Sequence, residues 1–332
     1  MRLILHVGMG KTGTSSIQRA LQGNAQTLAA QDALYLGMWF SAIDTKFDGH
    51  DGLMAFCNST AEQQVEYARL FKQALAKTAD ANGTRTFIMS NEGLFDRVDK
   101  ILPFLNALRG ELDVSVLAYM RDPHQWLPSA FHQWSLRHKT YEGPMRSFSD
   151  FAPELIKQYE AIRIWQGHFS DILDVRLHDK GTDVVADFAK GCGLTLDLPD
   201  VRHLERSEPA ETYLRAAFNA RLATGGMPET FDRQVHNVHA RPVPTFETLM
   251  DLCFKHDNID GIVEEQRELF EFIKKNLGFD FLSGPPTAPR QPDQAALQTR
   301  LIDYLIEITL EQSIRLKRLE KLAHERSQNE GG

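Results

Sequence analysis

One segment near the amino terminus, residues 3–18 (LILHVGMGKTGTSSIQ), constrains the fold more than any other part of the sequence. Its apolar start is typical of a buried strand, its glycines permit a tight turn, and its run of Thr and Ser residues is typical of a helix start. The first backbone N–H groups of a helix lack partners and favour an anion, and Lys11 adds a full positive charge there. The segment therefore predicts a loop that holds a phosphate group.

The glycine spacing of this loop differs from that of the common P-loop NTPases. Their pattern, G-x-x-x-x-G-K-[ST], requires a glycine five residues before Gly10, where this chain has Leu5. Such enzymes also place an acidic residue after a later strand to help hold Mg²⁺. Glu92 and Asp122 follow later apolar segments, so a kinase or NTPase remains an alternative.

The loop sequence GKTGTS, residues 10–15, resembles the 5′-phosphosulfate loop of sulfotransferases that use 3′-phosphoadenosine 5′-phosphosulfate (PAPS). In that family a strand is followed by K-[ST]-G-T-[TS]. A second family element is an Arg that ends a central strand, with a Ser eight residues later; Arg121 and Ser129 match it after the apolar segment 114–120. The resemblance implies that Arg121 and Ser129 bind the 3′-phosphate of the donor. It also implies that the 5′ side is bound by Gly10, Lys11, Thr12, Gly13, Thr14, Ser15 and Ser16.

A carboxylate, Glu92, follows the apolar segment 86–89. Open α/β sheets place their chemistry at the carboxyl ends of the strands, which makes this position a candidate for catalysis. In sulfotransferases the catalytic base is His in many cytosolic members and Glu in many carbohydrate-directed ones. The resemblance implies that Glu92 is the base and that Lys11 stabilises the departing phosphate oxygens. The alternative is a structural Glu92 that caps the next helix or pairs with an Arg.

Strand-like and helix-like segments alternate over the first 200 residues, with apolar runs at 3–7, 33–36, 86–89, 114–120 and 173–177. This alternation predicts an α/β fold, a three-layer sandwich with a central parallel sheet. The resemblance implies the P-loop NTPase-like arrangement of the sulfotransferases. We expect this α/β domain over 1–282, mainly helical from about 209, then a Pro-rich connector over 283–294 and a C-terminal helix over 295–326.

Three features leave alternatives open. The aromatic and acidic residues of 37–58 fit either a packed surface loop or part of an acceptor cleft. The apolar stripe of the last helix fits either docking on the domain or a homodimer seam. The family's third element, a basic glycine-containing loop over the nucleotide, has no clear copy, and its candidates are Lys180, Arg206 and Arg241.

Composition narrows the classes of function. The net charge of −8 argues against a general binder of nucleic acid or anionic membranes. Three cysteines without C-x-x-C pairs indicate neither a disulfide framework nor a zinc site, so we expect a cytoplasmic protein. No apolar stretch approaches the roughly 20 residues that a membrane-spanning helix needs. Taken together, the sequence predicts a sulfotransferase that uses PAPS and no metal.

The acceptor is expected to be a small molecule or a glycan that offers a hydroxyl or an amine. In-line transfer to it needs positioning and charge stabilisation, which the predicted loop supplies. Two alternatives come from other classes: a P-loop kinase or NTPase that uses Mg·ATP, and a non-catalytic nucleotide-binding scaffold.

Overall fold

The computed structural model describes residues 1–179, 181, 183–197, 209–234, 244–283 and 292–329. The chain divides into two compact units, which are described separately here. Unit 1 comprises residues 1–131, 148–205 and 257–287, and unit 2 comprises residues 132–147, 206–256 and 288–332. Lys180, Arg206, Arg241 and most of the expected Pro-rich connector lie outside the described residues.

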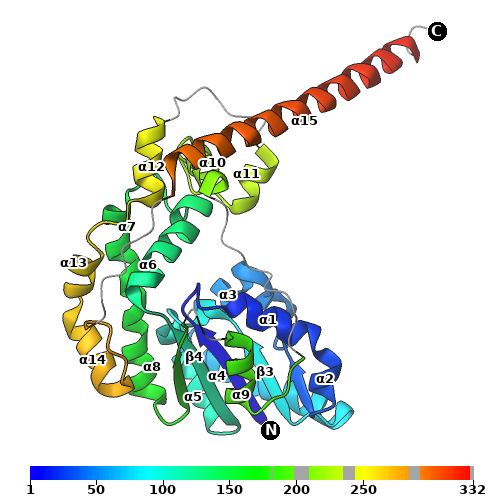
Figure 1. Ribbon diagram of the computed structural model, residues 1–332. Helices are drawn as coiled ribbons and strands as arrows, with labels where there is room; N and C mark the ends of the chain where they lie inside the picture. The colour runs from blue at the N-terminus through cyan, green and yellow to red at the C-terminus, as the bar shows by residue number, and fades with distance from the viewer. Residues whose placement is uncertain (180, 182, 198–208, 235–243, 284–291, 330–332) are drawn as a thin grey trace. The chain divides into compact units, whose positions relative to one another are not determined.

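Unit 1 is built on a five-stranded parallel sheet of order β2-β3-β1-β4-β5. Strands β3 and β4 of this sheet are labelled in Figure 1. The strands are β1 (Arg2–Gly8), β2 (Ala33–Tyr35), β3 (Thr86–Ser90), β4 (Asp113–Met120) and β5 (Leu173–Leu177). All five coincide with the apolar runs expected from the sequence, and the expected α/β class with a central parallel sheet is confirmed. The central strand β1 is paired on one side with β3, Leu5 opposite Met89, and on the other with β4, Leu5 opposite Val116.

Helices cover both faces of this sheet. The helices between β1 and β3 are α1 (Thr14–Gly23), α2 (Ala25–Ala29), η1 (Thr45–Phe47), α3 (Gly49–Cys57) and α4 (Ala61–Asn82). Those between β3 and β5 that belong to unit 1 are η2 (Glu92–Leu94), α5 (Val98–Arg109), α6 (Pro123–Phe131), α7 (Phe148–Leu155), η4 (Ile156–Glu160) and α8 (Ala161–Phe169). The unit is completed by α9 (Val184–Cys192), α13 (Ile259–Glu264) and α14 (Arg267–Leu277).

The side-chain alternation of the strands gives the sheet two apolar faces, as parallel sheets require. On one face, Ile4, Ile88 and Leu117 join a buried cluster with residues of α1, α2 and α9. Towards the opposite side, α5 packs against β4 and α8 against β5. The core thus lies in two layers, one on each face of the sheet. These layers hold the strands so that their carboxyl ends lie along one edge.

The helix that follows the loop is short, because it is divided from α2 at Asn24, whose Nδ2 donates to the carbonyls of Ala20 and Asp197. The segment 37–58, which has no regular period, contains α3. It also buries Phe40, Phe47 and Phe56, so these aromatic rings form packing contacts rather than an open cleft wall.

Unit 2 is helical. It contains the π-helical segment η3 (His132–Arg137), α10 (Pro209–Asn219), α11 (Pro228–Gln234), α12 (Phe246–Phe254) and the long α15 (Gln294–Asn329). Helix α10 packs against η3, α12 and α15. The buried Lys139 holds the connection after η3, because its backbone pairs with Gly226 and its Nζ donates to the carbonyl of Leu222 at 2.6 Å.

The three cysteines, Cys57, Cys192 and Cys253, are buried free thiols. Burial raises the pKa of Cys57 to about 11 and that of Cys192 to about 12, so both stay protonated near neutral pH. Within the described part of the chain, no helix is both long and apolar enough to cross a bilayer.

Candidate functional site

The loop between β1 and α1 has an unusual backbone. Lys11 has a φ of 67° and Gly13 a φ of 85°, and only the second of these positions is glycine. A Cβ added at Gly13 would lie 2.7 Å from Cγ1 of Val184 on α9, so this position requires glycine for space as well as conformation. The left-handed conformation of a lysine costs free energy that the surrounding contacts must offset.

Hydrogen bonds to β4, to α6 and within the loop itself hold the loop. The N–H of Met9 donates to the carbonyl of Tyr119 at 3.0 Å, and the Thr12 hydroxyl donates back to the carbonyl of Met9 at 2.6 Å. Trp126 Nε1 donates to the carbonyl of Gly10 at 2.8 Å, and Arg121 Nη1 to that of Lys11 at 3.2 Å.

These bonds orient the loop's donors. The C=O and N–H of a trans peptide point in opposite directions. Protein donors satisfy the carbonyls of Met9, Gly10 and Lys11. The N–H groups of the next three residues, 10–12, therefore point away from those donors. The loop is thus arranged as a set of backbone N–H groups that suits an anion.

The start of α1 continues this set of donors. Gly13 is the N-cap residue, and no side chain of the described residues caps the first turn. The Thr14 hydroxyl is buried and has no hydrogen-bond partner within the described part of the chain. Ser15 is exposed and Ser16 is half-buried. An anion with several oxygens fits these groups, because it accepts from N–H, hydroxyl and ammonium donors together.

Glu92 lies beside the same helix. Gln18 of α1 donates from Nε2 to Glu92 Oε2 at 3.0 Å and to the carbonyl of Ser90 at 3.2 Å. The helix-capping alternative for Glu92 does not describe this site, because Asn91 is the N-cap and accepts from the N–H of Gly93. Burial, and secondly the charge of Glu92, raise the pKa of Tyr35 to about 12, so a neutral phenol stands near the carboxylate.

Arg121 directly follows β4, and its position is fixed through its main chain. The hydroxyl of the fully buried Tyr159 donates to the Arg121 carbonyl at 2.5 Å. Ser129 is half-buried on α6, three residues after Trp126. Residues three apart share one side of a helix, so Ser129 lies on the side whose Trp126 contacts the loop.

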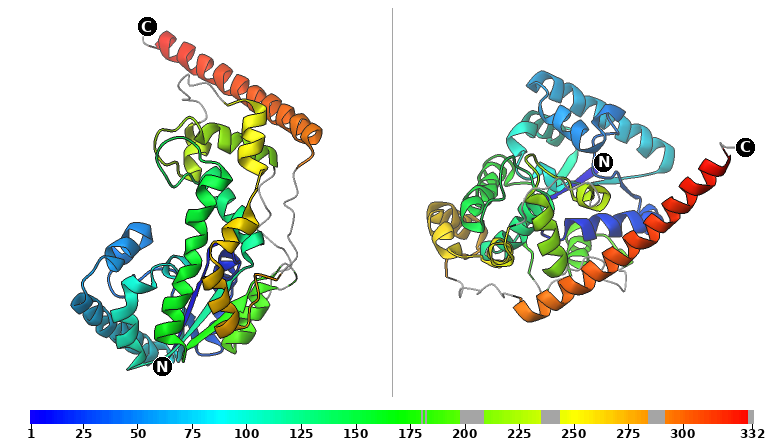
Figure 2. Two further views of the ribbon diagram at one scale, coloured as in Figure 1. Left: turned by 90° about the vertical axis from the view of Figure 1, so that its left-hand side faces the viewer. Right: turned by 90° about the horizontal axis from the view of Figure 1, so that it is seen from above.

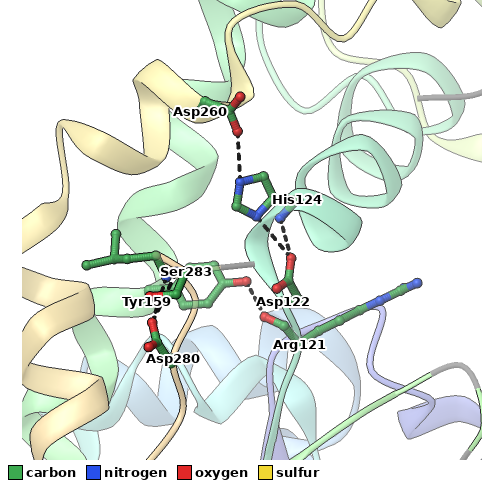
Figure 3. A network of polar contacts seen from close by, with 8 residues as sticks. Arg121, Asp122, His124, Tyr159, Asp260, Asp280 and Ser283 are labelled. Carbon is green, nitrogen blue, oxygen red and sulfur yellow. Dashed lines mark hydrogen bonds and ion pairs between the residues drawn. The ribbon is translucent and has the colours of Figure 1, made fainter. Parts of the chain in front are cut away.

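A polar network surrounds the start of α6 (Figure 3). Asp122 accepts from the N–H of His124 at 2.8 Å and lies 3.2 Å from its Nδ1, while Nε2 lies 3.1 Å from Asp260 of α13. The hydrogen bond to Asp122 is the main cause that raises the pKa of His124. The Asp122 carboxylate therefore already binds His124. This contact makes Asp122 less suited to be the Mg²⁺ ligand of a kinase or NTPase.

Three further histidines, His6, His132 and His138, lie elsewhere in the structure. His6 is fully buried in β1 with Nδ1 2.7 Å from Ser90 Oγ, and burial lowers its pKa to about 3. His132 and His138 belong to unit 2. Among the described residues, no group of three or more His, Cys, Asp and Glu side chains is placed to hold a metal ion.

The structure thus gathers the predicted residues at one edge of the sheet. β1 lies between β3 and β4, so the segments that follow these three strands carry the loop, Glu92 and Arg121 respectively. Sequence reasoning missed the residues that orient them: Gln18, Trp126 and Tyr159. Their contacts link positions far apart in the chain, and no local pattern signals them.

Comparison with known proteins gives matches among solved structures alone. No family model and no curated protein matches the chain. A sulfotransferase domain from the curacin biosynthetic pathway matches with a TM-score of 0.36 and 10% identity, over 80% of this chain and 96% of that one. A retinol dehydratase in a complex with retinol and PAP matches with a TM-score of 0.31 and 14% identity, over 86% and 83%.

The family expected from the sequence is therefore represented among the similar structures.

Proposed function

We propose that this protein is a sulfotransferase that moves a sulfuryl group from PAPS to a hydroxyl or amine of a small-molecule or glycan acceptor. The observation that carries the proposal is the hydrogen bond from Arg121 to the carbonyl of Lys11. It places a guanidinium beside the phosphate-type loop. A donor with phosphate groups at both its 5′ and 3′ positions needs two neighbouring anion sites of this kind.

The loop is proposed to bind the 5′-phosphosulfate through the backbone N–H groups of residues 10–15, the hydroxyls of Thr14, Ser15 and Ser16, and the Lys11 ammonium. The N–H of Ser16 already donates to the carbonyl of Gly13 at 2.9 Å. The Thr12 hydroxyl already donates to Met9, so we assign Thr12 to the shape of the loop together with its N–H. Arg121 and Ser129 are proposed to bind the 3′-phosphate. PAPS supplies the sulfuryl group and a bisphosphate leaving group.

The transfer is balanced by one proton movement. The acceptor oxygen or nitrogen forms a bond to sulfur while the bond between sulfur and the bridging phosphate oxygen breaks. Glu92 takes the proton that the acceptor loses, and Lys11 stabilises the negative charge that develops on the departing phosphate oxygens. A carboxylate can accept several hydrogen bonds, so the Gln18 contact is compatible with this role.

The donor class is tested by calorimetric titration with adenosine 3′,5′-bisphosphate, AMP and Mg·ATP. The proposal expects the bisphosphate to bind most tightly, without added metal. Preference for Mg·ATP would instead support a kinase or NTPase. If none of the three nucleotides binds, the result would contradict the proposed donor site and support a scaffold, or a site that forms only with its acceptor.

A matched pair of variants sharpens this test. Lys11→Ala should weaken binding of the bisphosphate. Arg19→Ala, which removes an exposed cation from α1, should leave this binding unchanged. Equal effects would show that the titration reports general charge rather than the loop.

The proposed cytoplasmic location is supported by the three cysteines, which are free thiols.

A further inference from the structure

Helix α15 is anchored in unit 2 through its first turns. Leu297 and Leu301 are 4% and 7% exposed, and α15 packs against α10. The helix then continues as one unbroken rod (Figure 2). Apolar side chains remain exposed along this rod at Ile302, Leu305, Ile306, Leu310, Ile314, Leu316, Leu319 and Leu322. Such a row of exposed large apolar residues marks an interaction surface.

Part of this row follows a coiled-coil spacing. Ile302, Leu305, Leu316 and Leu319 are 58%, 54%, 59% and 61% exposed. Together with Thr309 and Gln312 they occupy positions that alternate by three and four residues, as the a and d positions of a heptad do. We call these six residues the α15 seam. It is about 25 Å long at a rise of about 1.5 Å per residue.

The α15 seam is symmetric about its own centre. Ile302 and Leu319, Leu305 and Leu316, and Thr309 and Gln312 are three pairs with the same midpoint, between residues 310 and 311. Two identical helices that run antiparallel, with a two-fold axis at this midpoint, would bring the members of each pair together. The apolar pairs would then lie at both ends and two Thr309–Gln312 pairs in the middle, and polar residues within such a seam set its register.

The charges along α15 have the matching polarity. The half before the midpoint carries Asp303 and Glu307, with Arg300 as its exception. The half after it carries Arg315, Lys317 and Arg318, with Glu311 and Glu320 as its exceptions. An antiparallel pair places each acidic half beside a basic half, whereas a parallel pair places like charges together.

From the exposed seam, its internal symmetry and this charge polarity, we propose that the protein forms a homodimer in which two copies of α15 pack antiparallel through Ile302, Leu305, Thr309, Gln312, Leu316 and Leu319. The dimer does not depend on the proposed sulfotransferase activity. Its tests need no nucleotide, so the two proposals fail separately.

Cysteine cross-linking of the full chain tests the direction of the helices. Two differently tagged forms, Ile302→Cys and Leu319→Cys, are expressed alone and together under oxidising conditions. The antiparallel dimer predicts a disulfide between the two forms when they are mixed and none in either form alone, because like positions lie about 25 Å apart. A disulfide in Ile302→Cys alone would overturn the proposal. The unmodified chain is the background control, since its three cysteines are buried.

The oligomeric mass tests the seam itself. The unmodified chain should have the mass of a dimer in light scattering. Leu305→Glu combined with Leu316→Glu should raise the dissociation constant by about tenfold or more, because carboxylates would be buried in the seam. Leu310→Glu, at a position 59% exposed and outside the seam, is the matched control and should leave the dimer intact.

Circular dichroism of each variant shows whether the chain stays folded. A folded double variant that remains dimeric would overturn the proposal. So would an unmodified chain that is monomeric or tetrameric at micromolar concentration.

Discussion

Arg121 donates from Nη1 to the main-chain carbonyl of Lys11 across 3.2 Å, although the two residues are 110 positions apart in the chain. The bond joins the two sequence motifs that define the candidate site, the loop after β1 and the arginine after β4. It also orients the peptide between Lys11 and Thr12, because a donor on the carbonyl side directs the N–H to the other side. A single contact therefore contributes to both proposed anion sites.

Removal of the Lys11 ammonium should abolish most sulfuryl transfer. Lys11→Ala keeps a Cβ at the same left-handed φ of 67°, so the backbone cost is unchanged while the charge is lost. The rate at saturating donor should fall by about 10²-fold or more, as when one donor that stabilises a developing anion is removed. Steady-state kinetics with a responsive acceptor measures this, and near-normal turnover in the variant would refute the role of Lys11.

Glu92→Gln should lower the turnover rate by about 10²-fold while the bisphosphate still binds, because general base catalysis typically contributes this much. The substitution preserves shape but removes the group that accepts the proton. Gln18→Met removes the amide that holds Glu92 and serves as the comparison. We expect a smaller loss of rate there. Weakened nucleotide binding in Glu92→Gln would show instead that Glu92 is structural.

Arg121→Ala should narrow the difference in affinity between adenosine 3′,5′-bisphosphate and AMP, because the guanidinium is proposed to contact the 3′-phosphate. Tyr159→Phe removes only the hydroxyl that donates to the Arg121 carbonyl. It should shift the same difference in the same direction by a smaller factor. Calorimetry with both nucleotides measures this difference in affinity. An unchanged difference in Arg121→Ala would place the 3′-phosphate site elsewhere.

Trp126→Phe should weaken nucleotide binding without removing a charge. The variant keeps an aromatic ring in a fully buried position but loses the bond from Nε1 to the Gly10 carbonyl. A hydrogen bond of this type contributes about 1 kcal/mol, so we expect the dissociation constant of the bisphosphate to rise by about fivefold. An unchanged constant would mean that the loop holds its conformation without Trp126.

Acid should destabilise the fold through His6. The side chain titrates near 6.5 when exposed, whereas burial lowers its pKa to about 3 in the folded protein. Below pH 6.5 the unfolded chain binds a proton that the folded chain excludes. The free energy of unfolding should therefore fall as pH decreases towards about 3, by up to about 1.4 kcal/mol per pH unit from this group.

Urea unfolding of the unmodified chain and of His6→Asn at several pH values measures this contribution. The variant is expected to be less stable near neutral pH, because it loses packing against Tyr119 and Phe188. Its stability should depend less steeply on pH below 6.5. Parallel curves for the two proteins would contradict the prediction.

Local sequence was sufficient to place the five strands and the segments that follow them. Apolar runs such as residues 3–7 and 114–120 are buried on both sides, and a parallel sheet accepts such runs in the order that the alternation with helices dictates. Parallel strands end at one edge, so the sequence predicts the loop after β1, Glu92 and Arg121 on that edge.

The apolar stripe of α15 shows how far a periodic pattern can be taken. The sequence pattern includes Leu297, Leu301, Leu305 and Leu319 in one stripe and leaves docking and dimerisation as alternatives. In the structure the first two of these residues are buried within unit 2, while the last two remain exposed. Only tertiary packing separates the two parts of the stripe.

The sequence by itself determined the class of fold, the strands and the phosphate-type loop, because these depend on burial patterns and turn chemistry among neighbouring residues. Tertiary structure alone decided that β1 lies between β3 and β4, that Gln18 holds Glu92, and that Trp126 and Arg121 hold the loop carbonyls. The physical reason is that these contacts join residues brought together only when the whole sheet forms. Their free energies depend on distance and orientation in space, which no spacing along the chain encodes.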